Sequence, residues 1–213
     1  MKQHLRIAIL MTLVTTLIFG VLYPLAVTGL GQLCFPKQAN GSLIEQNGKL
    51  IGSRLIGQSF SADWYFHPRP SSAGNGYDPV AAAGGASNLG PTNKQLTDRV
   101  KADVAKLRAE NPNAPIPVDL VTTSGSGLDP DISPAAADFQ IPRVARARHM
   151  SESDLRAIVA KHTQQRQFGF LGEPRVNVLE LNLDLDASRP PRNKEVPKRV
   201  LHVRTARCFT SFF

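Results

Sequence analysis

The stretch "IAILMTLVTTLIFGVLYPLAVTGLGQL", from Ile7 to Leu33, decides the fold class because it contains no charged residue. About 20 apolar residues span a bilayer as a helix, and this run is longer than that. Lys2 and Arg6 precede it, and the next positive charge is Lys37. Because positive charges mark the cytoplasmic side, the sequence predicts a cytoplasmic N-terminus over residues 1–6, a transmembrane anchor over this stretch, and the remaining chain outside the cytoplasm.

Two other kinds of N-terminal segment compete with a retained anchor. A cleaved signal peptide has a shorter apolar core, and Ala26–Thr28 is a poor cleavage site. A lipoprotein signal needs a small residue before the cysteine, whereas Leu33 precedes Cys34. We therefore expect a retained anchor. Within it, Pro24 predicts a kink or the end of the tightly wound part, because proline lacks the backbone N–H.

The charge of the chain is concentrated at its C-terminal end. The formal net charge is +8, and residues 187–213 hold seven Lys or Arg and one Glu. The basic character therefore belongs to a tail, which we expect to be disordered, and nucleic-acid binding loses its main support. The two cysteines, Cys34 and Cys208, match no metal-ligand spacing, so no metal site is expected on them.

Residues 34–186 have the pattern of one small α/β (α+β) domain. Asn47-Gly48 is a strong hairpin turn signal, and Ser133 and Ser151 each have the side chain and position of a helix N-cap. We expect an aromatic cluster at 64–66 to hold one end of a long Gly- and Pro-rich loop against the core. The expected order is a hairpin over 42–57, the loop over 60–91, a helix over 92–112, a strand over 116–124, helices from Ser133 and Ser151, and a strand over 175–186 with one face buried.

The stretch "VTTSGSGLDPDISPAAADFQIPRVARAR", residues 121–148, offers three interpretations. As a calcium loop it places Asp129, Asp131 and Ser133 at alternate positions, but proline and glutamine stand where Gly and Glu are needed. As a phosphate cradle, "SGSG" from Ser124 offers flexible backbone N–H groups, but no lysine follows. The preferred interpretation is a shaped loop followed by a helix start at Ser133-Pro134.

The same stretch continues into a basic helix. We expect Pro142 to interrupt this helix. Arg143, Arg146 and Arg148 follow it, either as a solvated face or as a contact with a partner protein. The chain contains no GxxxxGK[ST], DKTG, HExxH or GxSxG motif, so we expect no catalytic site of its own.

Seven ordered motifs carry a resemblance to a known family. They are "YPLAVTGLGQ", "GQSF", "YFHPRPS", "GGASNLGPTN", "IPVDLVTTSGSGLDPDISPAAA", "QIPRVARAR" and "GFLGEPRVNVLELNLDLD". In this order they resemble the C subunit (KdpC) of the bacterial potassium-transporting Kdp ATPase, over about residues 5–186. The pattern of that family ends near Asp186, where the basic tail begins.

The resemblance implies a single-pass bacterial inner-membrane protein with a periplasmic domain. It implies a complex with a potassium-channel-like subunit, a P-type ATPase subunit and a small membrane peptide, with K+ as the transported ion. The family's C subunit is described as a catalytic chaperone that raises the affinity of the pump for ATP, so ATP is expected only through the complex, with no firmly bound cofactor. A weak nucleotide candidate is the Gly-rich run that includes Gly84, Gly85, Ser87 and Asn88.

The function expected from residues and resemblance together is that of a non-catalytic subunit. It would stabilise the assembly of the channel-like and ATPase subunits of a high-affinity, ATP-driven potassium uptake complex. The alternative is a stand-alone, membrane-anchored periplasmic binding or folding-helper protein, and an anchored hydrolase would need a nucleophile–base pair that the sequence does not suggest. The residues expected to contact a partner are Arg69, Pro70, Ser71, Ser124, Ser126, Asp129, Asp131, Arg143 and Arg146.

Overall fold

The computed structural model describes residues 1–46, 48–74, 76–78 and 86–190. Within them the chain divides into two compact units, residues 1–55 and the chain from Ile56 onward. Asn47, Gly84, Gly85, Cys208 and most of the expected tail lie outside the described residues.

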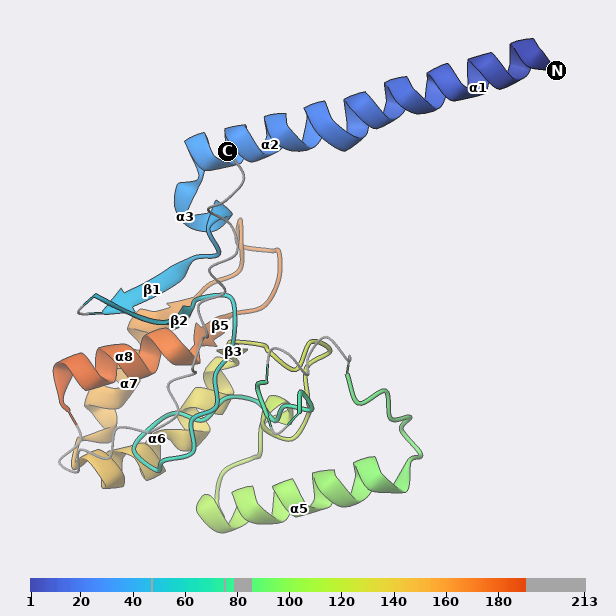
Figure 1. The fold of residues 1–213 in the computed structure, drawn as a ribbon. Coiled ribbons are helices and arrows are strands. Elements are labelled where there is room, and N and C mark those ends of the chain that lie inside the picture. Colours follow the sequence, from blue (N-terminus) through green and yellow to red (C-terminus); the bar gives the residue numbers. More distant parts are fainter. Residues whose placement is uncertain (47, 75, 79–85, 191–213) are drawn as a thin grey trace. The chain divides into compact units, whose positions relative to one another are not determined.

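The first unit begins with the long apolar helix drawn in blue in Figure 1. It consists of α1 (Lys2–Thr15), a π-helical segment η1 (Thr16–Leu22) and α2 (Tyr23–Cys34). Its side chains are exposed or half-exposed along the whole length, although most of them are apolar. The helix is long and apolar enough to cross a membrane. At 1.5 Å per residue it spans about 50 Å, more than the hydrocarbon core requires.

Pro24 does not end this helix, so one of the two alternatives expected from sequence, the end of the tightly wound part, is wrong. The helix continues to Cys34, and its hydrogen-bond register changes before the proline, where the Tyr23 N–H bonds the Ile18 carbonyl, five residues back. Because Pro24 has no N–H to donate, a local π-helical turn accommodates the missing α-helical bond without breaking the helix.

The first unit ends with the predicted hairpin, which the structure confirms. After the short helix α3 (Pro36–Ala39), strand β1 (Leu43–Gln46) pairs antiparallel with β2 (Lys49–Ser53). Gly48 has a φ of 71°, the left-handed geometry that this turn requires.

The second unit is a helical layer with a small antiparallel sheet (Figure 1). Its helices are α5 (Lys94–Glu110), α6 (Pro134–Arg148), α7 (Glu152–His162) and α8 (Val178–Ser188), together with the 3₁₀ turn η2 (Val118–Leu120). The sheet has the order β3-β5-β4, from β3 (Asp131–Ile132), β5 (Arg175–Asn177) and β4 (Thr163–Gln164). The core lies between α6, α7 and α8 and includes Phe66, Ile141, Leu155 and Leu181.

The predicted strand over 175–186 is correct only for its first three residues. From Val178 the chain is helical, and the Asn177 side chain caps α8 by accepting the Glu180 N–H at 3.1 Å. The alternating leucines fit a strand, but Val178, Leu181 and Leu185 also have helical spacing and all three are buried. Over so short a run the two periods both fit, and packing against the core selects the helix.

Two further expectations are wrong. Residues 116–124 form no strand but contain the 3₁₀ turn η2, because Pro115 and Pro117 have no N–H to donate to a neighbouring strand. Pro142 lies inside α6 and does not interrupt it. An internal proline costs about 3 kcal/mol or more, and the burial of Ile141 and Val144 on both sides of it offsets that cost. The helix starts at Ser133 and Ser151 are confirmed, each with a side-chain cap.

Candidate functional site

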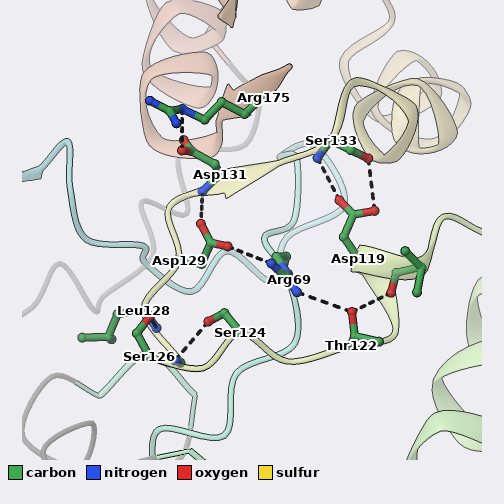
Figure 2. Close-up of polar contacts among 12 residues, drawn as sticks. Arg69, Asp119, Thr122, Ser124, Ser126, Leu128, Asp129, Asp131, Ser133 and Arg175 are labelled. Carbon is green, nitrogen blue, oxygen red and sulfur yellow. Dashed lines mark hydrogen bonds and ion pairs between the residues drawn. The ribbon is translucent and has the colours of Figure 1, made fainter. Parts of the chain in front are cut away.

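Two loops that are far apart in sequence meet beside the start of β3 (Figure 2). Nη1 of Arg69 lies 2.8 Å from Oδ2 of Asp129, and the two side chains are 23% and 27% exposed. Nη2 of Arg69 also donates to the Thr122 hydroxyl at 3.4 Å. We term residues 69–73, Tyr77 and residues 122–131 the loop cluster. It brings together most of the residues that the sequence predicted as partner contacts.

Ser71 holds the two loops together through its hydroxyl. Oγ donates to the Gly127 carbonyl at 2.6 Å, and it accepts the backbone N–H groups of Ala73 at 3.2 Å and Tyr77 at 3.0 Å. One small side chain therefore satisfies three backbone groups in a half-buried place. Pro70, beside it, fixes the local backbone because its ring restricts φ.

Tyr77 was missed by sequence reasoning, and its buried side chain stabilises the loop cluster. It is buried, it has a φ of 56°, and its hydroxyl donates to the Arg69 carbonyl at 2.8 Å. Burial, with the negative charge of Asp129 as a second cause, raises the pKa of the Tyr77 hydroxyl far above its usual value, so it stays protonated as a donor.

Gly57 was also missed, and its role is to allow close approach. Its N–H donates to the Leu128 carbonyl at 2.8 Å. A Cβ at this position would overlap the Tyr77 ring and lie 2.5 Å from the Asp129 carbonyl oxygen. Only glycine allows the chain to pass so close to the cluster.

Both serines of the "SGSG" run accept backbone N–H groups of the same loop. The Gly127 N–H donates to Oγ of Ser124 at 3.0 Å, and the Leu128 N–H donates to Oγ of Ser126 at 3.1 Å (Figure 2). These N–H groups, which a phosphate would need, are therefore engaged within the loop. Gly127 has a φ of 68°, and a Cβ there would be 3.0 Å from Cβ of Ala73.

The three candidate calcium ligands are each used separately. Oδ1 of Asp129 accepts the Asp131 N–H at 3.0 Å, Asp131 pairs with Nε of Arg175 at 3.1 Å, and Ser133 caps α6. Among the residues that the structure describes, no group of three or more His, Cys, Asp or Glu side chains could hold a metal ion.

The helix-start interpretation is confirmed at Ser133, with a contribution from a residue that the sequence did not indicate. The Asp119 carboxylate accepts the Ser133 N–H at 2.8 Å and its hydroxyl at 3.1 Å. A carboxylate at the N-terminus of α6 also stabilises the helix, because its negative charge lies at the positive end of the helix dipole. Asp119 lies in the turn η2, and no local signal in the sequence links it to Ser133.

The predicted arginine contacts divide into internal and exposed ones. Arg143 is held inside the unit: Nε pairs with Glu110 at 2.8 Å, Nη1 donates to the Asp63 and Tyr65 carbonyls, and Nη2 donates to Gln140. Its guanidinium is thus engaged within this chain. Arg146 is exposed, and its Nε donates to the Pro142 carbonyl at 3.1 Å.

The weak nucleotide candidate is only partly described. Ser87 and Asn88 are exposed, and Asn88 has a φ of 50°. Gly84 and Gly85 lie outside the described residues. The described part contributes two exposed polar side chains at the surface.

Taken together, the described chain combines one helix that could span a membrane with a small α/β unit whose two loops are locked by hydrogen bonds and one ion pair. The family model for KdpC, "K+-transporting ATPase, c chain", matches residues 5–187. The chain therefore belongs to the KdpC family, whose members are subunits of the K+-transporting ATPase complex.

Curated relatives align with this chain over almost their whole length. A potassium-transporting ATPase KdpC subunit of Koribacter versatilis (strain Ellin345) is 60% identical over 190 residues, which cover 89% of this chain and 97% of the relative. The KdpC subunit of Methylobacterium nodulans is 59% identical over 87% of this chain and 98% of its own length. That of Caulobacter vibrioides (strain NA1000 / CB15N) is 57% identical over 90% and 96%.

Proposed function

We propose that this chain is the non-catalytic, membrane-anchored subunit that stabilises the assembly of a high-affinity, ATP-driven potassium uptake complex. In this proposal α1, η1 and α2 cross the inner membrane with the N-terminus in the cytoplasm, and the second unit lies in the periplasm. Its partners are the potassium-channel-like subunit, the P-type ATPase subunit and the small membrane peptide of the Kdp complex.

The observation that carries the proposal is the construction of the loop cluster. Several of its polar side chains bond one another or the backbone, as in the Arg69–Asp129 pair and the three contacts of Ser71. Such bonding holds this part of the surface in one shape. A pre-organised surface reduces the entropy lost on association, so it suits recognition by contact.

The test is a detergent pull-down through this chain, followed by a potassium-stimulated ATPase assay on the proteins that come with it. We expect a channel-like subunit and an ATPase to co-purify, and removal of this chain to abolish the activity. Arg69→Ala and Asp129→Ala should each lower the yield of the complex, because each leaves the other charge without its partner. The charge-swapped double variant, R69D with D129R, should recover part of that yield.

The matched control is the pair Arg99 and Asp103, which lies on α5 with side chains 32% and 33% exposed. Arg99→Ala should leave the yield unchanged, because a surface pair contributes at most about 1 kcal/mol. If the chain comes down alone, the alternative of a stand-alone periplasmic binding or folding-helper protein replaces this proposal.

We propose that any effect of the chain on ATP is exerted through the complex and not through a firmly bound nucleotide. Comparing the KM for ATP of the complex with and without this chain tests the effect itself. Ser87→Ala together with Asn88→Ala then asks whether the exposed Gly-rich run contributes to it.

A further inference from the structure

The connection between β4 and β5 carries an exposed aromatic tip, which we define as residues Phe168–Leu171. Phe168 is 86% exposed, Phe170 is 70% exposed and Leu171 is 47% exposed. Gly169 and Gly172 have φ values of 81° and 77°, so the chain turns tightly on either side of Phe170. Three large apolar side chains in four residues are a costly arrangement to leave in water, which marks this tip as a contact surface.

Three of the four backbone N–H groups of the tip donate to carbonyls of the same turn. Gln167 and Leu171 exchange two backbone bonds, each of 2.9 Å, and the N–H groups of Gly169 and Phe170 bond the Arg166 and Gln167 carbonyls, each at 3.2 Å. A segment that leaves water must satisfy its polar backbone groups internally. These bonds lower the cost of moving the N–H groups of the tip out of water.

Two arginines flank the tip in sequence, and both are paired. Arg166 lies 2.6 Å from Glu173, and Arg175 lies 3.1 Å from Asp131. The surroundings of the tip are thus polar and close to neutral. Neutral surroundings favour a contact that is driven by burial of the apolar side chains of the tip. They do not favour one driven by attraction to anionic groups.

The size of the tip favours lipid over protein. A stable protein interface buries about 800 Å² on each partner around an apolar centre. Here the apolar surface is confined to three side chains and is bordered by the charged residues Arg166 and Glu173. A narrow apolar wedge with a polar border matches the bilayer interface, where apolar side chains enter and charged neighbours stay at the headgroups.

If the anchor helix crosses the membrane as proposed, the second unit remains tethered to that bilayer. Residues 35–55 connect Cys34 to the second unit, and even a fully extended chain of that length reaches at most about 75 Å. We propose that the aromatic tip inserts into the interfacial layer of the bilayer that holds the anchor. This inference rests on the proposed membrane anchoring.

The test places tryptophan at the tip of the full-length chain, reconstituted into phosphatidylcholine vesicles with or without bromine on the acyl chains. The variant is Phe170→Trp, and the matched control is Val118→Trp, because Val118 is also 70% exposed. The native Trp64 contributes the same background to both. We expect brominated lipid to quench the tryptophan at position 170, with emission at shorter wavelength, and to leave the tryptophan at position 118 unquenched. Added salt should not reduce the quenching.

The outcomes separate the inference from the proposal beneath it. If the chain does not float with the vesicles, the membrane anchoring fails and this inference fails with it. If the chain floats, its circular dichroism is unchanged and position 170 is quenched no more than position 118, the tip does not enter lipid. If the quenching disappears once the partner subunits are bound, the tip meets a protein surface in the complex, and the assignment to lipid is overturned.

Discussion

The guanidinium of Arg148 and the carboxylate of Asp186 form an ion pair of 2.7 Å in which the arginine side chain is only 1% exposed. Arg148 also donates to the Trp64 carbonyl at 2.6 Å and the Arg189 carbonyl at 2.8 Å. The Tyr65 hydroxyl donates to the same carboxylate at 2.7 Å, and burial together with this bond raises the pKa of Tyr65 to about 12. The last residue of α6 thus joins α8 to the aromatic segment before the loop cluster.

Replacing Arg148 should destabilise the second unit strongly. Arg148→Met removes the buried ion pair and leaves two carbonyls without their donor, so we expect the free energy of unfolding to fall by about 3 kcal/mol. Arg146→Met, at an exposed arginine two residues earlier, should change it by less than about 0.5 kcal/mol. Chemical denaturation of the detergent-solubilised chain measures both. If Arg148→Met lowered the free energy of unfolding as little as Arg146→Met, the buried ion pair would contribute little to stability.

A methyl group at Gly57 should disturb the loop cluster. Gly57→Ala places a Cβ against the Tyr77 ring and the Asp129 carbonyl, so we expect a loss of about 1–3 kcal/mol, as for other overpacked sites. Gly125→Ala is the control, because a Cβ there meets nothing within 4 Å. Thermal unfolding of both variants tests the expectation, which fails if the midpoint of G57A stays at that of the wild type.

The Ser71 hydroxyl should contribute more to the stability of the loop cluster than the Ser126 hydroxyl. Ser71→Ala removes three hydrogen bonds to half-buried backbone groups, and we expect a loss of about 1–3 kcal/mol. Ser126→Ala removes one exposed bond, which the Leu128 N–H donates, and should cost less than about 1 kcal/mol. Amide hydrogen exchange at Ala73 and Tyr77 should rise in the first variant only. Unchanged protection there would contradict the bridging role of Ser71.

His67 should make the stability of the chain depend on pH near neutrality. Burial, with the positive charge of Arg143 as a second cause, lowers the pKa of His67 below 6.5. Below pH 6.5 the unfolded state therefore binds a proton that the folded state does not, and stability falls as the pH decreases towards the folded pKa. We expect His67→Gln to reduce this loss between pH 7.5 and 5.5, measured by urea denaturation. An identical pH dependence in wild type and H67Q would refute the expectation.

The parts of the fold that could be predicted from sequence are those that depend on neighbouring residues. The hairpin turn follows from the dipeptide at 47–48, with Gly48 in the left-handed region, and the starts of α6 and α7 need only serines that accept an N–H three residues on. The stretch from Val178 to Ser188 could not be assigned in this way, because its leucines fit a strand and a helix equally well. Contacts with the core decided between the two.

For the loop cluster, too, the sequence indicated individual residues but not the contacts between distant ones. Sequence reasoning named Arg69, Ser71 and Asp129, yet it could not pair them across 60 residues, nor find Tyr77, Gly57 or Asp119. Such pairs depend on how the intervening elements pack, and each chain segment carries no local sign of its distant neighbour.

By itself, the sequence determined the apolar helix that could span a membrane and the helix starts, because length, charge and capping act over a few residues. The tertiary structure decided which charges face inward. Arg148 is buried and Arg146 is exposed, although they lie two residues apart on one basic helix. Burial of a charge is favourable only where a partner and backbone acceptors meet it, and only the folded chain brings Asp186 and the Trp64 carbonyl to that place.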